Sequence, residues 1–200
     1  MHLDVKFFAD YIEKEKASGE EAVHIYGATY QRPRLVDALR RCFRRGSGDA
    51  IEIGCMAGGT SKLLAEVCAD YGRTLVCVDP WKNMDDYKWI DFAAHYPLFL
   101  EAIKPYADHV KVIRLESQKP VTIQRIQERE YAFAFVDGDH SQEGARVDLQ
   151  TVLPVTKYAV ASDDHRYDTR VQEAHRQIVG EFKDWQFQSF EDFREAWFTK

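Results

Sequence analysis

Two groups of acidic residues follow apolar stretches of the chain and could together hold a metal ion. Asp137 comes directly after residues 131–136, and Asp163 and Asp164 come shortly after residues 158–161. Carboxylates held close together repel one another and raise one another's pKa, and a divalent cation such as Mg²⁺ relieves that conflict. The sequence therefore predicts the three aspartates as Mg²⁺ ligands. The alternative is that each caps a helix or pairs with a nearby arginine. Those arginines are Arg146, Arg166 and Arg170.

Two residues beside the first aspartate could act as a general base. Asp139 and His140 follow Asp137 within three positions. Histidine has an ordinary pKa near neutrality, which suits it to take a proton from a hydroxyl group. A metal ion lowers the pKa of a hydroxyl that it binds, so a carboxylate could also suffice. Both residues are therefore candidate catalytic bases.

A glycine-rich turn after a short apolar stretch predicts a nucleotide-type ligand. Gly54 permits backbone angles that a side chain would forbid, and Gly58 lets a ligand approach the main chain closely. Met56 replaces the second glycine of a dinucleotide fingerprint, and Thr60 replaces the lysine of a phosphate loop. Glu52, just before the turn, would repel phosphate. The expected ligand is one that does not need a grip on a polyphosphate.

Three further residues stand where a bound nucleoside could be recognised. Asp79 ends the apolar stretch 74–78, at about the spacing expected for an acid on ribose hydroxyls, although it could instead cap the next helix. Trp81 could line the pocket or serve as an ordinary packing aromatic. Ser117, after residues 110–115, stands where an adenine edge could be read, but serine is also common in turns.

An α/β fold with a parallel sheet would bring all these residues to one edge. Apolar stretches alternate with segments of helical periodicity, which predicts helices on both faces of the sheet and a ligand at the carboxyl ends of the strands. The predicted strands are 50–53, 74–79, 110–115, 131–136 and 158–161. The first predicted helix begins at Pro33 and ends before Gly46. The other predicted helices are 61–71, 85–103 (broken near Pro97), 121–127, 142–153 and 171–182. Residues 131–136 are apolar on both faces and should be central. A closing hairpin is predicted from Trp185, Phe187, Phe193 and Trp197.

Composition limits the choice of partners. The formal net charge of −6 argues against nucleic acid as a main partner, and no apolar run approaches a membrane span. The four cysteines show no C-x-x-C pairing, which suits free thiols in a reducing cytoplasm, and no secretory leader is recognisable. We expect a single domain over residues 1–200, with a helical cap in residues 1–30 (helix 3–16). That aromatic segment and the aromatic tail motivate the expectation of a homodimer.

The motifs together resemble a known enzyme class. They are Glu52-Ile53-Gly54 with Gly58-Gly59-Thr60-Ser61, Val78-Asp79-Pro80-Trp81, residues 135–141 (Phe-Val-Asp-Gly-Asp-His-Ser), Asp148-Leu149 and Asp163-Asp164. The chain resembles class I S-adenosylmethionine-dependent methyltransferases over residues 30–180. Within that class it most resembles the macrocin/TylF-type sugar O-methyltransferases and the cephalosporin-hydroxylase-like (methyltransferase 24-like) group.

The resemblance implies a Rossmann-like sheet of seven strands whose last strand is antiparallel. It implies S-adenosylmethionine near a set of residues that comprises Glu52, Gly54, Gly58, Thr60, Ser61, Asp79, Trp81, Ser117 and Asp137. The three aspartates match the divalent-metal ligands of the group. Asp139 matches the proposed base of some members, and His140 falls where the catechol O-methyltransferase group has a basic lysine. The glycine pair usual before the fifth strand is replaced by residues 155–158, so that turn should differ.

The expected function is O-methyl transfer to a hydroxyl group of a small molecule, such as a sugar or a natural product, assisted by a divalent metal. An NAD-dependent oxidoreductase is one alternative, which Met56 disfavours. A non-catalytic domain that binds S-adenosylmethionine is another, and the concentration of carboxylates at one edge disfavours it.

Overall fold

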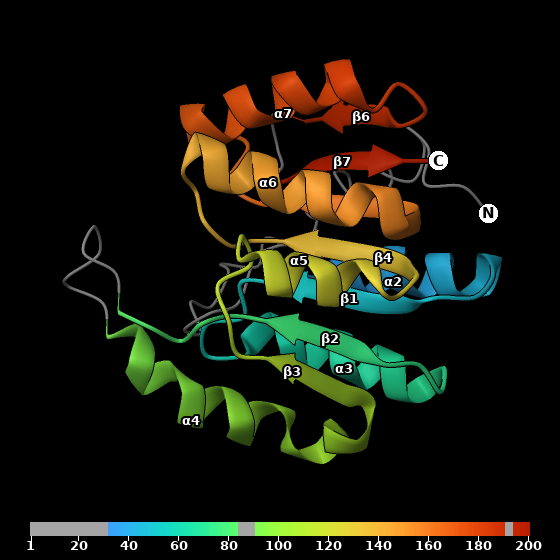
Figure 1. Cartoon of the computed structure of the whole chain (residues 1–200). Helices are drawn as coiled ribbons and strands as arrows, with labels where there is room; N and C mark the ends of the chain where they lie inside the picture. Colours follow the sequence, from blue (N-terminus) through green and yellow to red (C-terminus); the bar gives the residue numbers. More distant parts are fainter. Residues whose placement is uncertain (1–31, 84–90, 191–193) are drawn as a thin grey trace, which may run out of the picture.

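The computed structural model describes residues 32–83, 91–190 and 194–200, and within them one sheet carries helices on both faces (Figure 1). Several sequence predictions lie outside the described residues: the cap 1–30 with its helix 3–16, residues 85–90 of the helix expected at 85–103, and Phe193 of the hairpin. Within the described part of the chain, no helix combines the length and the apolar character needed to span a bilayer.

The sheet has seven strands in the order β3-β2-β1-β4-β5-β7-β6. The strands are β1 (Asp49–Ile53), β2 (Leu75–Val78), β3 (Val110–Ile113), β4 (Tyr131–Val136), β5 (Thr156–Ser162), β6 (Gln186–Ser189) and β7 (Ala196–Thr199). The first five pair in parallel, and β7 runs antiparallel to both β5 and β6. The five predicted strands and the antiparallel last strand are therefore confirmed.

The helices form one layer on each face of the sheet (Figure 1). The helices of one layer are α2 (Arg32–Arg45), α3 (Gly59–Asp70) and α4 (Phe92–Ile103), and those of the other are α5 (Pro120–Gln127), α6 (Gln142–Val152) and α7 (Thr169–Glu181). Short 3₁₀ helices follow α4 (Lys104–His109) and α6 (Leu153–Val155). The second of these leads directly into β5 in place of the usual glycine pair, so that turn does differ as expected.

The central strand β4 organises the core. All six of its residues are buried, as the apolar run predicts. Phe133 and Phe135 belong to the core under α2, α3 and α4, whereas Tyr131 and Val136 belong to the core under α5, α6 and α7. Alternating side chains of one strand thus serve both layers, which is the pattern of a parallel sheet covered on both faces.

The predicted break near Pro97 is wrong. Helix α4 begins at Phe92, where the Asp91 side chain caps it by accepting from the Ala94 N–H at 3.3 Å, and it continues through Pro97 to Ile103. Proline removes one hydrogen bond, to the carbonyl four residues earlier at Ala93. Both Ala93 and Pro97 are exposed, so water can satisfy that carbonyl and the helix need not end.

Candidate active site

The glycine turn after β1 packs against the end of β4. Gly54 and Gly58 have positive φ angles of 86° and 83°. A Cβ built on Gly54 would overlap the carbonyl oxygen of Asp137, so the two strand ends meet at a distance that only glycine permits. Gly58 caps α3, whose first N–H groups have no acceptor within the helix. This turn and the amino end of α3 form one wall of the candidate site.

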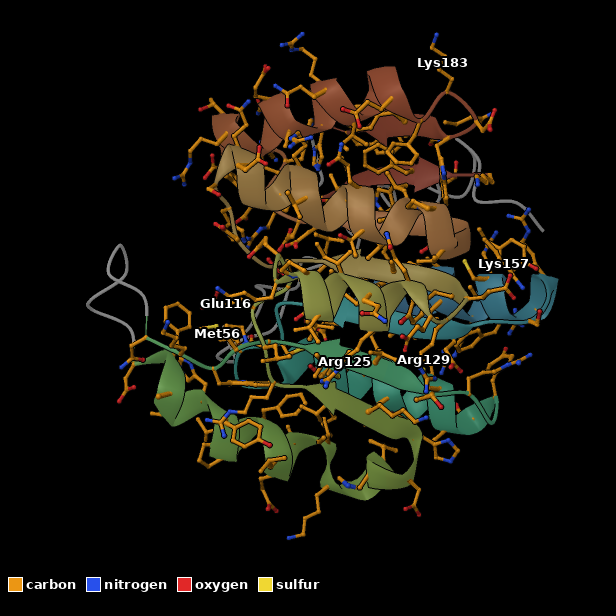
Figure 2. The ribbon with its side chains drawn as sticks, in the orientation of Figure 1. Met56, Glu116, Arg125, Arg129, Lys157 and Lys183 are labelled. Carbon is orange, nitrogen blue, oxygen red and sulfur yellow. The ribbon has the colours of Figure 1, made fainter. Side chains whose placement is uncertain are left out.

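Asp79 ties that turn to the end of β2. Its Oδ2 accepts the N–H groups of Cys55 at 2.9 Å and Met56 at 3.0 Å, and its Oδ1 accepts the N–H of Trp81 at 2.6 Å. A carboxylate offers about four acceptor positions, so about one is left for a ligand. Asp79 is therefore placed as predicted, but much of its capacity supports the turn. Figure 2 shows Met56 and Glu116 at this end of the molecule, with Lys157 at the opposite end.

Trp81 does not face an open pocket. Its side chain is only 2% exposed, and the ring packs against Tyr96 and Phe99 at centroid distances of 4.9 and 4.6 Å. The indole Nε1 donates to the Met56 carbonyl at 2.7 Å. The packing alternative for Trp81 therefore fits this structure, and the residue holds the turn from behind.

Three other predicted cofactor residues are also buried. Glu52, Thr60 and Ser61 are at most 4% exposed. Burial is the main cause that raises the pKa of Glu52 to about 8, so its carboxyl is largely protonated at neutral pH. In this structure these three side chains lie beneath the turn, and they do not offer a surface to a ligand.

Ser117 lies beside a buried carboxyl that site prediction from the sequence missed. Asp148 of α6 accepts from the Gln118 side chain at 3.2 Å, and burial raises its pKa to about 7. A Cβ on Gly138 would come within 2.8 Å of the Asp148 Oδ2, so Asp148 supports the loop after β4 from below. The available signal was an acid on the apolar face of the predicted helix, one residue before Leu149.

The ends of β4 and β5 bring two of the predicted aspartates together with a histidine. The strands are neighbours, with Val136 opposite Ser162. The Nε2 atom of His140 lies 3.3 Å from Asp137 Oδ1, and its Nδ1 atom lies 3.0 Å from Asp164 Oδ2. Possible ligand atoms of these three residues all lie within 4.8 Å of one another. The predicted neighbourhood of the two strand ends is confirmed.

Asp163 lies behind this converging set rather than in it. Its side chain is fully buried, and both carboxylate oxygens lack a hydrogen-bond partner among the described residues. Burial, reinforced by the nearby Asp137, raises its pKa well above the ordinary value. The converging set thus includes His140, and Asp163 as a metal ligand stays a prediction.

In this arrangement His140 is an imidazolium between carboxylates. Burial lowers its pKa, but Asp137 and Asp164 outweigh that effect and raise the pKa to about 11. Burial also opposes ionisation of Asp164, yet His140 and Arg194 hold the pKa of that carboxyl at about 2. Burial raises the pKa of Asp137.

The structure separates the two candidate bases. Asp139 is exposed, and its carboxylate accepts the Ser141 N–H at 2.9 Å and the Ser141 hydroxyl at 3.0 Å. Ser141 in turn caps α6 by accepting from the Gly144 N–H at 3.0 Å. Asp139 therefore stabilises the start of α6, whereas His140 joins the acidic site.

Sequence reasoning missed Arg194, which lies two residues before β7. Its guanidinium donates to Asp164 and lies 3.4 Å from Asp163. Of the arginines that the sequence suggested, Arg146 pairs with Glu143 and Arg170 with Asp168. The third, Arg166, lies over the ring of Tyr167 at 5.6 Å. No local signal marks Arg194, because only the pairing of β7 with β5 brings it to this edge.

A hollow elsewhere on the described surface is a poor candidate for the site. It encloses about 520 Å³ over α5, and its lining residues are Pro120, Ile123, Gln124, Gln127 and Glu128. It contains a single acid and no group of converging donors, so the chemistry points to the carboxyl edge of the sheet instead.

The residues at this edge fit both a divalent cation and a cationic nucleoside. Asp137 and Asp164 offer the oxygen donors that hard cations prefer. The glycine turn carries no lysine, and the carboxylate of Asp79 beside it suits a ligand with a positive charge rather than a polyphosphate.

The comparisons with known proteins agree with this arrangement. The model of a family described as a methyltransferase domain matches residues 51–164. Among solved structures, CalS11, a TDP-rhamnose 3′-O-methyltransferase of calicheamicin biosynthesis, superposes with a TM-score of 0.62 at 14% identity, covering 100% of this chain and 96% of its own. The O-methyltransferase NovP gives a TM-score of 0.61 at 12% identity over 85% of this chain and 79% of its own.

A third solved structure is an O-methyltransferase from Bacillus cereus in complex with SAH. It gives a TM-score of 0.61 at 15% identity, covering 98% of this chain and 92% of its own. A search of curated protein sequences finds no match. At these identities the solved structures establish a shared fold, and the matched family model covers more than half of the chain.

Proposed function

The chain belongs to the methyltransferase domain family, and from this premise we propose that it is an S-adenosylmethionine-dependent O-methyltransferase acting on a hydroxyl group of a small molecule. The observation that carries the proposal is the convergence of Asp137, His140 and Asp164 at the strand ends, beside the glycine turn of β1. This convergence supports a base and a cation site beside the carboxyl ends of the strands, where parallel α/β sheets bind their ligands.

The cofactor part of the proposal rests on the turn and on Asp79. When bound, S-adenosylmethionine supplies an electrophilic methyl group on a sulfonium sulfur. The free acceptor position on Asp79 suits a ribose hydroxyl, and the first N–H groups of α3 suit the carboxylate of the methionine part.

His140 is the proposed base. Transfer forms a bond from the acceptor oxygen to the methyl carbon and breaks the carbon–sulfur bond, whose electron pair stays on sulfur, so the hydroxyl proton must move to a base. An imidazolium cannot accept that proton, and Asp137 and Asp164 cause its protonation. Neutralisation of these carboxylates by a bound cation would return the pKa of His140 toward its ordinary range.

A divalent cation such as Mg²⁺ is proposed at Asp137 and Asp164, with Asp163 behind them. When bound, it would neutralise these carboxylates and favour the deprotonated form of an acceptor hydroxyl. The chain itself would hold the cation, position the acceptor and take up the proton. Because well-oriented reactants gain on the order of 7–11 kcal/mol over free encounter, positioning should supply most of the rate.

A sugar hydroxyl is the acceptor that we favour, because CalS11 carries that activity in its description and shares the fold. Calorimetric titration with S-adenosylhomocysteine and with NAD tests the cofactor. Methyl transfer to a panel of nucleotide-linked sugars and phenols, with Mg²⁺ or with chelator, tests the reaction. Binding of NAD alone would favour the oxidoreductase, and cofactor binding without transfer would favour a non-catalytic domain. The proposed homodimer is tested by light scattering.

A further inference from the structure

Arg194 places a fixed positive charge in the acidic site. Its guanidinium donates to Asp164 and lies 3.4 Å from Asp163, the two aspartates that end β5. Asp164 is also one of the two carboxylates at which the proposed function places a divalent cation, and Asp163 lies behind it. A guanidinium and a divalent cation repel each other at such distances, so both cannot sit fully on the same carboxylates.

The main chain around Arg194 is held firmly. Its carbonyl accepts the N–H of Arg166 at 3.1 Å. The next residue, Glu195, pairs with Arg34 of α2 at 2.5 Å, and both side chains of that pair are fully buried. Trp197 donates to Glu195 at 3.3 Å. The position of Arg194 is therefore built into the fold rather than set by a loose surface side chain.

The guanidinium also lies beside an aromatic ring in its present position. It lies 5.6 Å from the ring centre of Tyr167, which is 66% exposed. An arginine over an aromatic face gains a cation–π interaction. The Nε atom of Arg194 is buried without a hydrogen-bond partner among the described residues, so one of the donors of this side chain is unsatisfied. A guanidinium displaced from the carboxylates would therefore still have the Tyr167 ring beside it.

We propose that Arg194 is a tethered counter-ion that competes with the divalent cation for Asp164, and that cation binding displaces it. The inference rests on the proposed function in placing a cation at this site. It adds that the free protein carries its own substitute for the cation, which weakens cation binding. Occupancy of the site should then depend on the position of one side chain.

Mn²⁺ binding to the full chain, without cofactor or acceptor, tests the competition directly. Free Mn²⁺ is counted by electron paramagnetic resonance. Arg194→Gln should bind Mn²⁺ about tenfold more tightly than the wild type, because one opposing charge is gone. Arg194→Lys keeps the charge and should stay near the wild type. Arg125→Gln is the control: it removes an exposed charge on α5, away from the Tyr167 ring and the acidic site, and should change the affinity by less than about twofold.

Unchanged, weaker or absent Mn²⁺ binding in Arg194→Gln would overturn the inference. If that variant does not fold, nuclear magnetic resonance of the wild-type protein provides a second test. On addition of Mg²⁺ the Nε–H resonance of Arg194 should shift. A resonance that does not shift as Mg²⁺ fills the site would overturn the proposal. The proposed function fails by other results, namely no binding of S-adenosylhomocysteine or no methyl transfer. Tighter Mn²⁺ binding in Arg194→Gln, together with methyl transfer in the presence of chelator, would support the competition by Arg194. It would overturn the proposal that the metal takes part in methyl transfer.

Discussion

Gly54 of the β1 turn lies against the carbonyl of Asp137 at the end of β4, with no room for a Cβ between them. The Asp137 N–H donates to the Ile53 carbonyl at 2.7 Å, which fixes the same junction from the other side. The glycine turn, which should contact the cofactor, and Asp137, which should lie near the acceptor, are thus in direct contact. A change at this junction should affect both.

Gly54→Ala should destabilise the protein by about 3 kcal/mol or more, because a methyl group would overlap the Asp137 carbonyl and φ is 86°. Binding of S-adenosylhomocysteine should fall as well. Chemical denaturation and calorimetry measure the two effects. Gly180→Ala is the control: nothing lies within 4 Å of its Cβ and it is helical, so it should stabilise by about 0.5–1 kcal/mol. Equal effects at both glycines would contradict the tight junction.

The two candidate bases should separate in kinetics. His140→Gln should lower kcat by about 10²–10⁴-fold, the usual contribution of a general base, while binding of S-adenosylhomocysteine changes little. Asp139→Asn should have a small effect on kcat, since its carboxylate holds Ser141 at the start of α6. Steady-state assays on one acceptor under metal saturation measure both. The reverse order, with Asp139→Asn the more damaging, would assign the base to Asp139.

Much of this site followed from the pattern of strands and helices. Asp79, Asp137 and Asp164 lie at strand ends. In a parallel sheet the carboxyl ends of the strands lie at one edge, independently of the conformation of the loops. The central place of β4 followed from its apolar residues on both faces. These features depend on periodicity and on order along the chain, which the sequence contains.

Side-chain directions at the strand ends could not be predicted in the same way. Asp163 and Asp164 are adjacent in sequence, yet Asp163 is buried and Asp164 faces His140. Asp164 has a positive φ of 55°, which turns the chain at that point. Trp81, also with positive φ, turns into the core. Arg194 reaches the site only through the pairing of β7 with β5, a contact between distant parts of the chain.

Glu52 should make stability depend on pH. Burial raises its folded pKa to about 8, whereas an unfolded glutamate titrates near its ordinary value of 4.5. The folded carboxyl keeps its proton, so its contribution is fully present below pH 4.5 and is lost as pH rises toward about 8. Glu52→Gln stays neutral, and its stability relative to the wild type should rise by about 1.4 kcal/mol per pH unit at most across that window.

Urea unfolding at several pH values measures this difference. Glu128→Gln changes an exposed carboxyl on the surface and should give a curve parallel to that of the wild type. A Glu52→Gln curve that is also parallel would mean that Glu52 ionises normally in the folded protein.

The buried pair of Arg34 and Glu195 should matter most when only one partner is removed. Both side chains are fully buried, and the Arg34 Nε donates to Glu195 at 2.5 Å. Arg34→Met leaves a buried carboxylate without its partner and should cost about 3–5 kcal/mol. The double variant Arg34→Met with Glu195→Met removes both charges and should be more stable than either single variant. Unfolding free energies of the four proteins form a double-mutant cycle, and additive losses would show that the two charges do not interact. The same variants should change the Mn²⁺ affinity only if the Arg34–Glu195 pair holds Arg194 in place. Such a change would link the stability of β7 to the acidic site.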